Sequence, residues 1–153
     1  MLHIVLYQPE IPHNTGSAGR LALATGARLH LIKPLGFSLD EKSVRRAGLD
    51  YWKDVDLQLW DSLDELLAAH PAARCWFLST KAKKSLWHAD FADGDFLIFG
   101  PETRGLPESL LHAQPDGALR IPMQPDSTRS LNLATSVAIV LYEACRQLGS
   151  PAS

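Results

Sequence analysis

Cysteine is scarce in this sequence. Only Cys75 and Cys145 occur among the 153 residues, and neither belongs to a C-x-x-C pair. Zinc sites and dithiol redox centres are usually built from closely spaced cysteines, so the sequence predicts no metal centre and no redox pair. Cys145 falls within an apolar helical pattern and is interpreted as a buried thiol.

Long hydrophobic runs and a basic leader are also missing. The chain begins MLHIVLY, which has the character of a strand, and no stretch resembles a transmembrane helix or a signal peptide. The formal net charge is -2, so any nucleic-acid site must be a local basic patch. We therefore expect a cytoplasmic, soluble protein that makes no contact with a membrane.

Two common nucleotide-binding glycine patterns are absent. Neither the dinucleotide fingerprint G-x-G-x-x-G nor the G-K-[ST] sequence of a phosphate-binding loop occurs. Their absence disfavours a flavodoxin-like or P-loop nucleotide binder.

The order of apolar segments predicts the fold class. Hydrophobic residues make up 46% of the chain, and its length fits one globular domain over residues 1–153. Strand-like segments alternate with helical ones, which favours an α/β fold with a mostly parallel sheet and helices on both faces. The expected strands are 2–7, 28–33, 55–60, 74–79, 95–99 and 118–121. The expected helices are 15–27, 40–46, 62–69, 107–112 and 130–148, with Asp40, Asp61 and Ser130 as N-caps of the second, third and last.

The last of these helices is apolar on more than one side. It is followed by Gly149 and Pro151, a combination that ends helices. Because so apolar a helix must be covered on most sides, we expect it to be buried within the domain or against a second subunit.

Polar loops follow several of the predicted strands, at the edge where parallel sheets bind ligands. In the first loop, Asn14 and Thr15 are suited to capping the next helix. Arg20 lies one to two turns into that helix and is suited to holding a phosphate. In a later loop, Gly100 permits close approach of a ligand and Gly105 suits a positive φ. Glu102 in that loop either serves a ligand or holds a neighbouring backbone N–H or arginine. The loops are 8–19, 79–84, 100–107 and 123–129.

Three sequence blocks carry a resemblance to a known family. They are N-x-G-x-x-x-R at residues 14–20, F-G-P-E-x-x-G-L-P at 99–107, and I-P-M…R-S-L-N-L at 121–133. In this order they resemble the three motifs of the SPOUT RNA methyltransferases, and R-R-A-G-L-D-Y-W at 45–52 resembles the TrmL (YibK-like) branch of tRNA 2'-O-methyltransferases. The resemblance covers nearly the whole chain. The loop at residues 125–129 is one residue longer than is usual in the family.

The resemblance implies a fold, a cofactor and an assembly. It implies a C-terminal trefoil knot, a homodimer, and S-adenosylmethionine bound by loops of the knot, without a metal. The dimer is expected to form through the last helix with help from the first. The positions that match the cofactor-binding residues of the family are Leu78, Gly100, Glu102, Ile121, Ser130, Leu131 and Asn132.

The resemblance also implies a substrate and a reaction. The expected substrate is the ribose 2'-OH of the wobble pyrimidine, cytidine or modified uridine, in the anticodon stem-loop of leucine tRNAs. Arg20 matches the residue that acts on this hydroxyl, either as a base or by binding the adjacent phosphate. Tyr142 matches a position near the site, or else packs in the dimer interface. A non-catalytic RNA-binding module of the same fold, and a methyltransferase acting at another RNA position, are the alternatives.

Basic residues that recur near tryptophans form the expected RNA surface. Trp52 and Trp87 lie beside them in the sequence, and indole rings can stack on bases. The alternative is a solvated charged face without a ligand. The basic residues assigned to RNA binding are Arg45, Arg46, Lys81, Lys83, Lys84 and Arg129.

Overall fold

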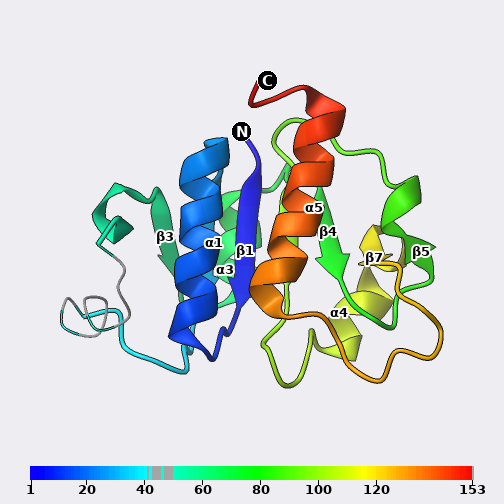
Figure 1. Cartoon of the computed structure of the whole chain (residues 1–153), viewed down its shortest axis with the longest axis horizontal. Coiled ribbons are helices and arrows are strands. Elements are labelled where there is room, and N and C mark those ends of the chain that lie inside the picture. Colours follow the sequence, from blue (N-terminus) through cyan, green and yellow to red (C-terminus); the bar gives the residue numbers. More distant parts are fainter. Residues whose placement is uncertain (41, 43–45, 47–49, 153) are drawn as a thin grey trace.

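A parallel sheet forms the centre of the molecule (Figure 1). The computed structural model describes residues 1–40, 42, 46 and 50–152, and within them seven strands lie in the order β3-β2-β1-β6-β4-β7-β5. Every neighbouring pair runs parallel. The predicted α/β fold with a parallel sheet is therefore confirmed. The strands are β1 (His3–Tyr7), β2 (Arg28–Ile32), β3 (Leu57–Trp60), β4 (Cys75–Leu78), β5 (Lys84–Ser85), β6 (Phe96–Phe99) and β7 (Ala118–Arg120).

All six strands expected from the sequence are present, with ends that differ by at most two residues. The strand that sequence reasoning missed is β5, which has two residues and pairs with β7 at the sheet edge. So short a strand carries no alternating apolar pattern, and hydrophobic periodicity cannot reveal it.

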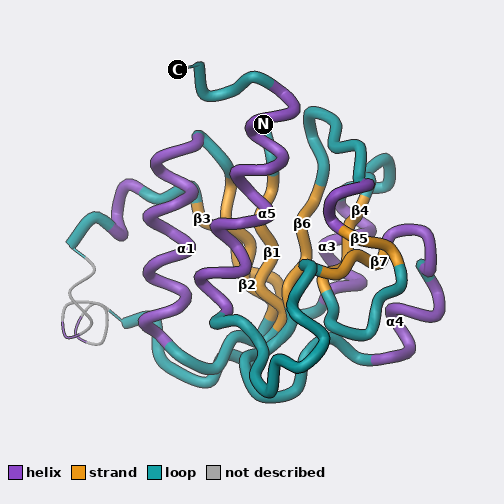
Figure 2. Tube along the Cα trace, turned by 45° about the vertical axis from the view of Figure 1, so that its right-hand side comes forward, coloured by secondary structure: helices purple, strands orange, loops and turns teal. Residues whose placement is uncertain are grey.

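Helices cover both faces of the sheet. In Figures 1 and 2, α1 and α5 lie side by side on one face, and α3 lies on the other. Among the described residues, no helix is both long and apolar enough to cross a membrane. The helix expected at 40–46 falls largely outside the described residues. The α-helices are α1 (Pro12–Thr25), α3 (Leu63–Ala69), α4 (Glu108–Ala113) and α5 (Leu133–Leu148), and the short 3-10 helices are η1 (Trp52–Asp54), η2 (Leu86–His88) and η3 (Pro115–Gly117).

Side chains that alternate along the central strands form two cores. In β1, Ile4 and Leu6 pack into the core beneath α1 and α5, whereas Val5 between them packs into the core with α3 and α4. All three are at most 1% exposed. Successive side chains of a strand point to opposite faces, so a strand covered on both faces reads as the continuous apolar run seen in the sequence.

Two of the predicted helix N-caps are wrong. Ser62, not Asp61, caps α3, and its hydroxyl accepts a hydrogen bond from the Glu65 backbone N–H at 3.1 Å. Helix α5 is capped by Asn132, not Ser130, and therefore begins later than expected. Each helix is preceded by several residues of capping type, so composition alone does not select among them. The predicted end of α5 is confirmed, since Gly149 caps it in the left-handed conformation.

Candidate active site

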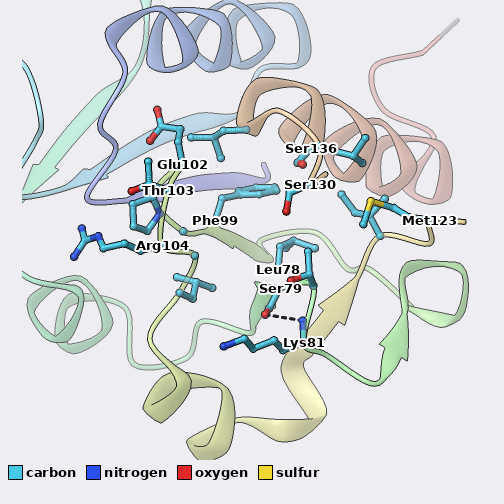
Figure 3. Close-up of a pocket in the computed structure, with 18 residues that line it drawn as sticks. Leu78, Ser79, Lys81, Phe99, Glu102, Thr103, Arg104, Met123, Ser130 and Ser136 are labelled. Carbon is cyan, nitrogen blue, oxygen red and sulfur yellow. Dashed lines mark hydrogen bonds between the residues drawn. The ribbon is translucent and has the colours of Figure 1, made fainter. Parts of the chain in front are cut away.

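A cavity of about 260 Å³ opens where β4, β6 and β7 end. This is the carboxyl edge of the sheet, where parallel α/β folds bind ligands. Three segments line it: the loop after β4, the loop after β6, and the long connection from β7 to α5 (Figure 3). The lining residues are Leu78, Ser79, Thr80, Lys81, Phe99, Gly100, Pro101, Glu102, Thr103, Arg104, Gly105, Leu106, Ile121, Met123, Ser130, Leu131, Leu133 and Ser136.

Most of the residues predicted to hold the cofactor line this cavity. These residues come from segments that are far apart in the sequence. Together they offer apolar side chains, one hydroxyl group and the backbone groups of the loops. That combination suits a flat apolar ring with polar edges. The predicted residues in the lining are Leu78, Gly100, Glu102, Ile121, Ser130 and Leu131, whereas Asn132 lies outside it.

The Glu102 carboxylate holds the loop that leads into α1. One of its oxygens accepts from the Glu10 backbone N–H and the other from that of Ile11, each at 2.8 Å. The second oxygen also accepts from Asn14 Nδ2 at 3.2 Å. Both oxygens are thus engaged by the protein. Of the two sequence interpretations of Glu102, these contacts match the one in which it holds neighbouring backbone N–H groups.

Asn14 joins the first loop to the last helix. Its Oδ1 accepts a hydrogen bond from Asn132 Nδ2 at 3.1 Å, while Asn132 Oδ1 accepts from the Thr135 backbone N–H at 3.2 Å. Asn14 and Thr15 were interpreted as possible caps of α1, but α1 begins earlier, at Pro12, and its N-cap, Ile11, makes no side-chain capping bond. Neither residue caps the helix. Asn14 is 4% exposed and serves as a buried link between motifs.

Glycine is required at position 100 by the loop itself. A Cβ on Gly100 would lie 2.4 Å from the Leu106 backbone nitrogen and 2.5 Å from the Gly105 carbonyl carbon. The loop after β6 therefore folds back onto its own start. Gly105 has φ 69°, the positive value that its sequence context predicted.

Arg20 and Tyr142 both lie outside the cavity lining. Arg20 is exposed on α1, and its guanidinium carbon lies 5.5 Å from the centre of the Tyr51 ring. The Tyr51 hydroxyl donates to the Gly16 carbonyl at 2.6 Å, so the ring beneath Arg20 is fixed to the same helix. Tyr142 is 45% exposed on α5.

The residues predicted to bind RNA differ in their position relative to the cavity. Lys81 lines the cavity, whereas Lys83 and Lys84 lie outside it and are exposed. The predicted residues Arg46 and Arg129 are also exposed. Arg45 lies outside the described residues.

The two tryptophans proposed for base stacking differ in accessibility. Trp87 is 65% exposed. Trp52 packs against α1, where a Cβ on Gly19 would be 2.7 Å from its ring. Trp52 is therefore partly covered by the protein, and Trp87 is the more accessible ring.

Sequence reasoning overlooked several cavity residues that lie inside the quoted motifs. Thr103 and Arg104 belong to F-G-P-E-T-R-G-L-P, and Met123 ends I-P-M. Their position in these blocks was the available signal. Among the described residues, no group of three or more His, Cys, Asp or Glu side chains is arranged to hold a metal.

Comparison with known proteins identifies the family. The SpoU rRNA Methylase family profile matches residues 1–142. The tRNA (cytidine(34)-2'-O)-methyltransferase of Escherichia coli (strain K12) is 51% identical over 99% of this chain and 96% of its own length. The enzyme of the same name from Aeromonas hydrophila is 51% identical over 97% of this chain and 96% of its own length.

Solved structures agree with this assignment. One, described as giving structural insights into the 2-OH methylation of C/U34 on tRNA, is 54% identical with a TM-score of 0.89, covering 97% of this chain and 96% of that one. The SpoU methyltransferase AviRb from Streptomyces viridochromogenes, in complex with the cofactor AdoMet, is 28% identical with a TM-score of 0.82 over 97% of this chain and 58% of its own.

These matches define an RNA methyltransferase of the SPOUT type, as the three motifs predicted. The chain belongs to the SpoU rRNA methylase family.

Proposed function

We propose that this protein transfers a methyl group from S-adenosylmethionine to the ribose 2'-OH of nucleotide 34 in tRNA. The observation that carries the proposal is the cavity in which the loops of the second and third motifs meet at the carboxyl edge of the sheet. The similarity to tRNA (cytidine(34)-2'-O)-methyltransferases over nearly the full chain supports the choice of tRNA and of position 34.

The residues of the cavity fit such a cofactor. Leu78, Ile121 and Leu131 offer apolar contacts for an adenine ring, and the backbone around Gly100 and the hydroxyl of Ser130 offer polar contacts. When bound, S-adenosylmethionine supplies an activated methyl group on a sulfonium, so the protein's task is mainly to align the acceptor oxygen.

Arg20 is proposed to act on the acceptor nucleotide. A guanidinium is a donor without an acceptor atom, so binding the neighbouring phosphate and orienting the ribose suits it better than removing a proton. Its exposed position over the Tyr51 ring leaves it accessible to RNA. Tyr142, also exposed, is proposed to lie near the acceptor or in a subunit interface.

The finer specificity is proposed from the sequence resemblance. We expect the accepted nucleotide to be cytidine or a modified uridine in the anticodon stem-loop of leucine tRNAs. Transfer of labelled methyl groups to total tRNA, followed by isolation of the labelled species, tests this. Binding of the cofactor without methyl transfer to any RNA would instead identify a non-catalytic RNA-binding module.

A knot and a dimer complete the proposal. The long connection from β7 to α5 lines the same cavity as the loops after β4 and β6, which supports the trefoil path expected for the family.

Exposed Leu23 on α1 and Tyr142 on α5 support a subunit interface on the face that these helices share. Light scattering should report a homodimer, and a stable monomer at micromolar concentration would contradict this assembly.

A further inference from the structure

The rim of the cavity carries an arginine without an assigned role. Lys81 and Arg104 are the two cationic side chains that line the cavity. Lys81 Nζ lies 2.5 Å from Glu108 Oε1, so a carboxylate offsets its charge. Arg104 is exposed, and none of the ion pairs found among the described residues includes it. Its charge is therefore available to a ligand.

The side chain that holds Arg104 is neutral. Arg104 Nη2 donates to Gln8 Oε1 at 3.1 Å, and an amide oxygen orients a guanidinium without cancelling its charge. Glu10 is close enough to interact electrostatically with Arg104. Its carboxylate, however, is bound by Thr103, whose backbone N–H donates at 2.8 Å and whose hydroxyl lies 2.8 and 3.0 Å from the two oxygens.

Gln8 adopts an unusual backbone conformation. Its φ is 50°, and it is the one non-glycine residue with positive φ within the described part of the chain. Its backbone N–H is fixed by the Ile32 carbonyl at 3.0 Å, at the carboxyl end of β1. Strained residues of this kind concentrate at ligand sites, because the surrounding structure must maintain them. Here the strained residue presents its amide to Arg104.

The loop fixes where Arg104 points. The Gly105 backbone N–H donates to the Pro101 carbonyl at 3.0 Å, which closes a turn around Arg104. In Figure 3 the Arg104 guanidinium points away from the interior of the cavity, whereas Ser130 and Met123 lie across it. Arg104 is therefore placed to meet a group that approaches from outside, rather than a cofactor within.

We infer that Arg104, oriented by Gln8, is a positioning residue that binds a phosphate of the substrate RNA next to the nucleotide being methylated. The inference rests on the proposed function. For a ribose to reach a methyl donor in the cavity, the phosphates beside it must pass over the rim. A planar guanidinium donates two parallel hydrogen bonds to phosphate oxygens and so fixes the direction of the strand as well as its charge.

The test compares Arg104→Ala, Arg104→Lys and Gln8→Glu with wild type and with a control, Arg28→Ala. Arg28 begins β2, so it lies at the amino ends of the strands, whereas the cavity lies at their carboxyl ends. Its side chain forms an ion pair with Asp56 at 2.9 Å. Methyl transfer to tRNA is measured at several salt concentrations, and cofactor binding is measured by calorimetry without RNA. Wild type is assayed first, so a wild-type protein without methyl transfer to tRNA would refute the proposed function itself.

If the inference holds, Arg104→Ala raises KM for tRNA by about tenfold or more, while kcat at saturating tRNA and the Kd for S-adenosylmethionine change little. The slope of log affinity against log salt becomes shallower by about 0.7 to 0.9, the value of one phosphate contact. Arg104→Lys gives an intermediate KM. Gln8→Glu gives a raised KM and a shallower slope although the arginine is still present, because a carboxylate then offsets its charge. Arg28→Ala behaves as wild type.

Two outcomes would overturn the inference. One is a wild-type KM and salt slope for both Arg104→Ala and Gln8→Glu in an enzyme that methylates tRNA. The other is weaker cofactor binding by Arg104→Ala without RNA, which would make Arg104 a cofactor ligand. If Arg104→Ala folds poorly, the KM and the salt slope of Gln8→Glu still test the inference, because this variant retains Arg104.

Discussion

Asn14 and Asn132 are 118 positions apart in the sequence, yet their side chains share a hydrogen bond of 3.1 Å. Asn14 also donates to Glu102. One buried amide thus joins the first motif to the other two. Arg20 lies on the helix that Asn14 belongs to, and the cavity is built from the segments that carry Glu102 and Asn132. The contact therefore fixes the position of α1 relative to the cavity.

The cap of α5 gives the first prediction. Asn132→Ala should lower the free energy of unfolding by about 1 kcal/mol or more, because it removes both the capping bond to Thr135 and the partner of buried Asn14. Denaturant unfolding measures this. Ser130→Ala is the matched control and should change stability by less than about 0.5 kcal/mol, as for an exposed surface position. Equal losses from both variants would show that Asn132 is not the cap.

Gly100 provides a prediction about cofactor affinity. Gly100→Ala should weaken binding of S-adenosylmethionine by about tenfold or more, because the new Cβ would displace the backbone of the loop at Leu106. Calorimetry measures the affinity. Gly26→Ala serves as a control for glycine replacement, since Gly26 has a positive φ at the end of α1 and a Cβ there meets no atom within 4 Å. It should cost stability but leave cofactor affinity unchanged, and unaltered binding by Gly100→Ala would contradict this account of the loop.

Some features of the fold and site leave a local pattern in the sequence, and those could be predicted, whereas others leave none. The strands buried on both faces read as continuous apolar runs, and helix α5 repeats its apolar residues at helical spacing, so both were predicted to within a few residues. The motif loops were predicted to converge because parallel strands end at one edge, and the cavity lies there. The role of Asn14 could not be predicted, and that of Glu102 was predicted only as one of two alternatives, since a hydrogen bond between distant segments leaves no local pattern.

The same limit applies to smaller features. The chain offers both Asp61 and Ser62 as caps of α3, and only the entry path of the backbone decides between them. The positive φ of Gln8 is equally hidden, because glutamine does not signal a left-handed conformation.

The buried side chain of His30 leads to a prediction about pH. Trp60 Nε1 donates to His30 Nδ1 at 2.9 Å, and His30 Nε2 lies 2.9 Å from His3 Nδ1. An indole nitrogen can only donate, so the His30 proton must reside on Nε2 and the ring is neutral. Burial, with the nearby charges of His3, His70 and Arg28, lowers the pKa of His30 to about 3 from its ordinary value of 6.5.

The direction of the effect follows from proton binding. Below pH 6.5 the unfolded chain takes up a proton at His30, whereas the folded protein does not until the pH approaches the lowered pKa. The contribution of His30 to the free energy of unfolding is therefore fully present above pH 6.5 and is lost as the pH falls from 6.5 towards the lowered pKa. At pH 5 the loss from this residue is about 2 kcal/mol. Urea unfolding at pH 7.5 and pH 5 measures the difference. His30→Gln should reduce it, and the exposed His112→Gln should not. An unchanged difference in His30→Gln would contradict the role of His30.

Arg20 gives a prediction about catalysis. Arg20→Ala should lower methyl transfer by about a hundredfold or more while leaving the Kd for S-adenosylmethionine unchanged, because Arg20 lies outside the cavity lining. Arg20→Lys should also be strongly impaired, since a point charge does not reproduce the planar fork of a guanidinium. Single-turnover rates with tRNA and calorimetry with the cofactor separate the two effects. Substantial turnover by the lysine variant would favour simple charge attraction to phosphate.

The central proposal is that the acceptor is the ribose hydroxyl of nucleotide 34. The most direct measurement is methyl transfer from labelled S-adenosylmethionine to a leucine tRNA with cytidine at position 34, compared with the same tRNA carrying 2'-deoxycytidine at that one position. Nuclease digestion and mass spectrometry then locate the label. We predict one 2'-O-methylcytidine at position 34 in the first tRNA and no label in the second. Equal labelling of both tRNAs, or label on a base, would contradict the proposal.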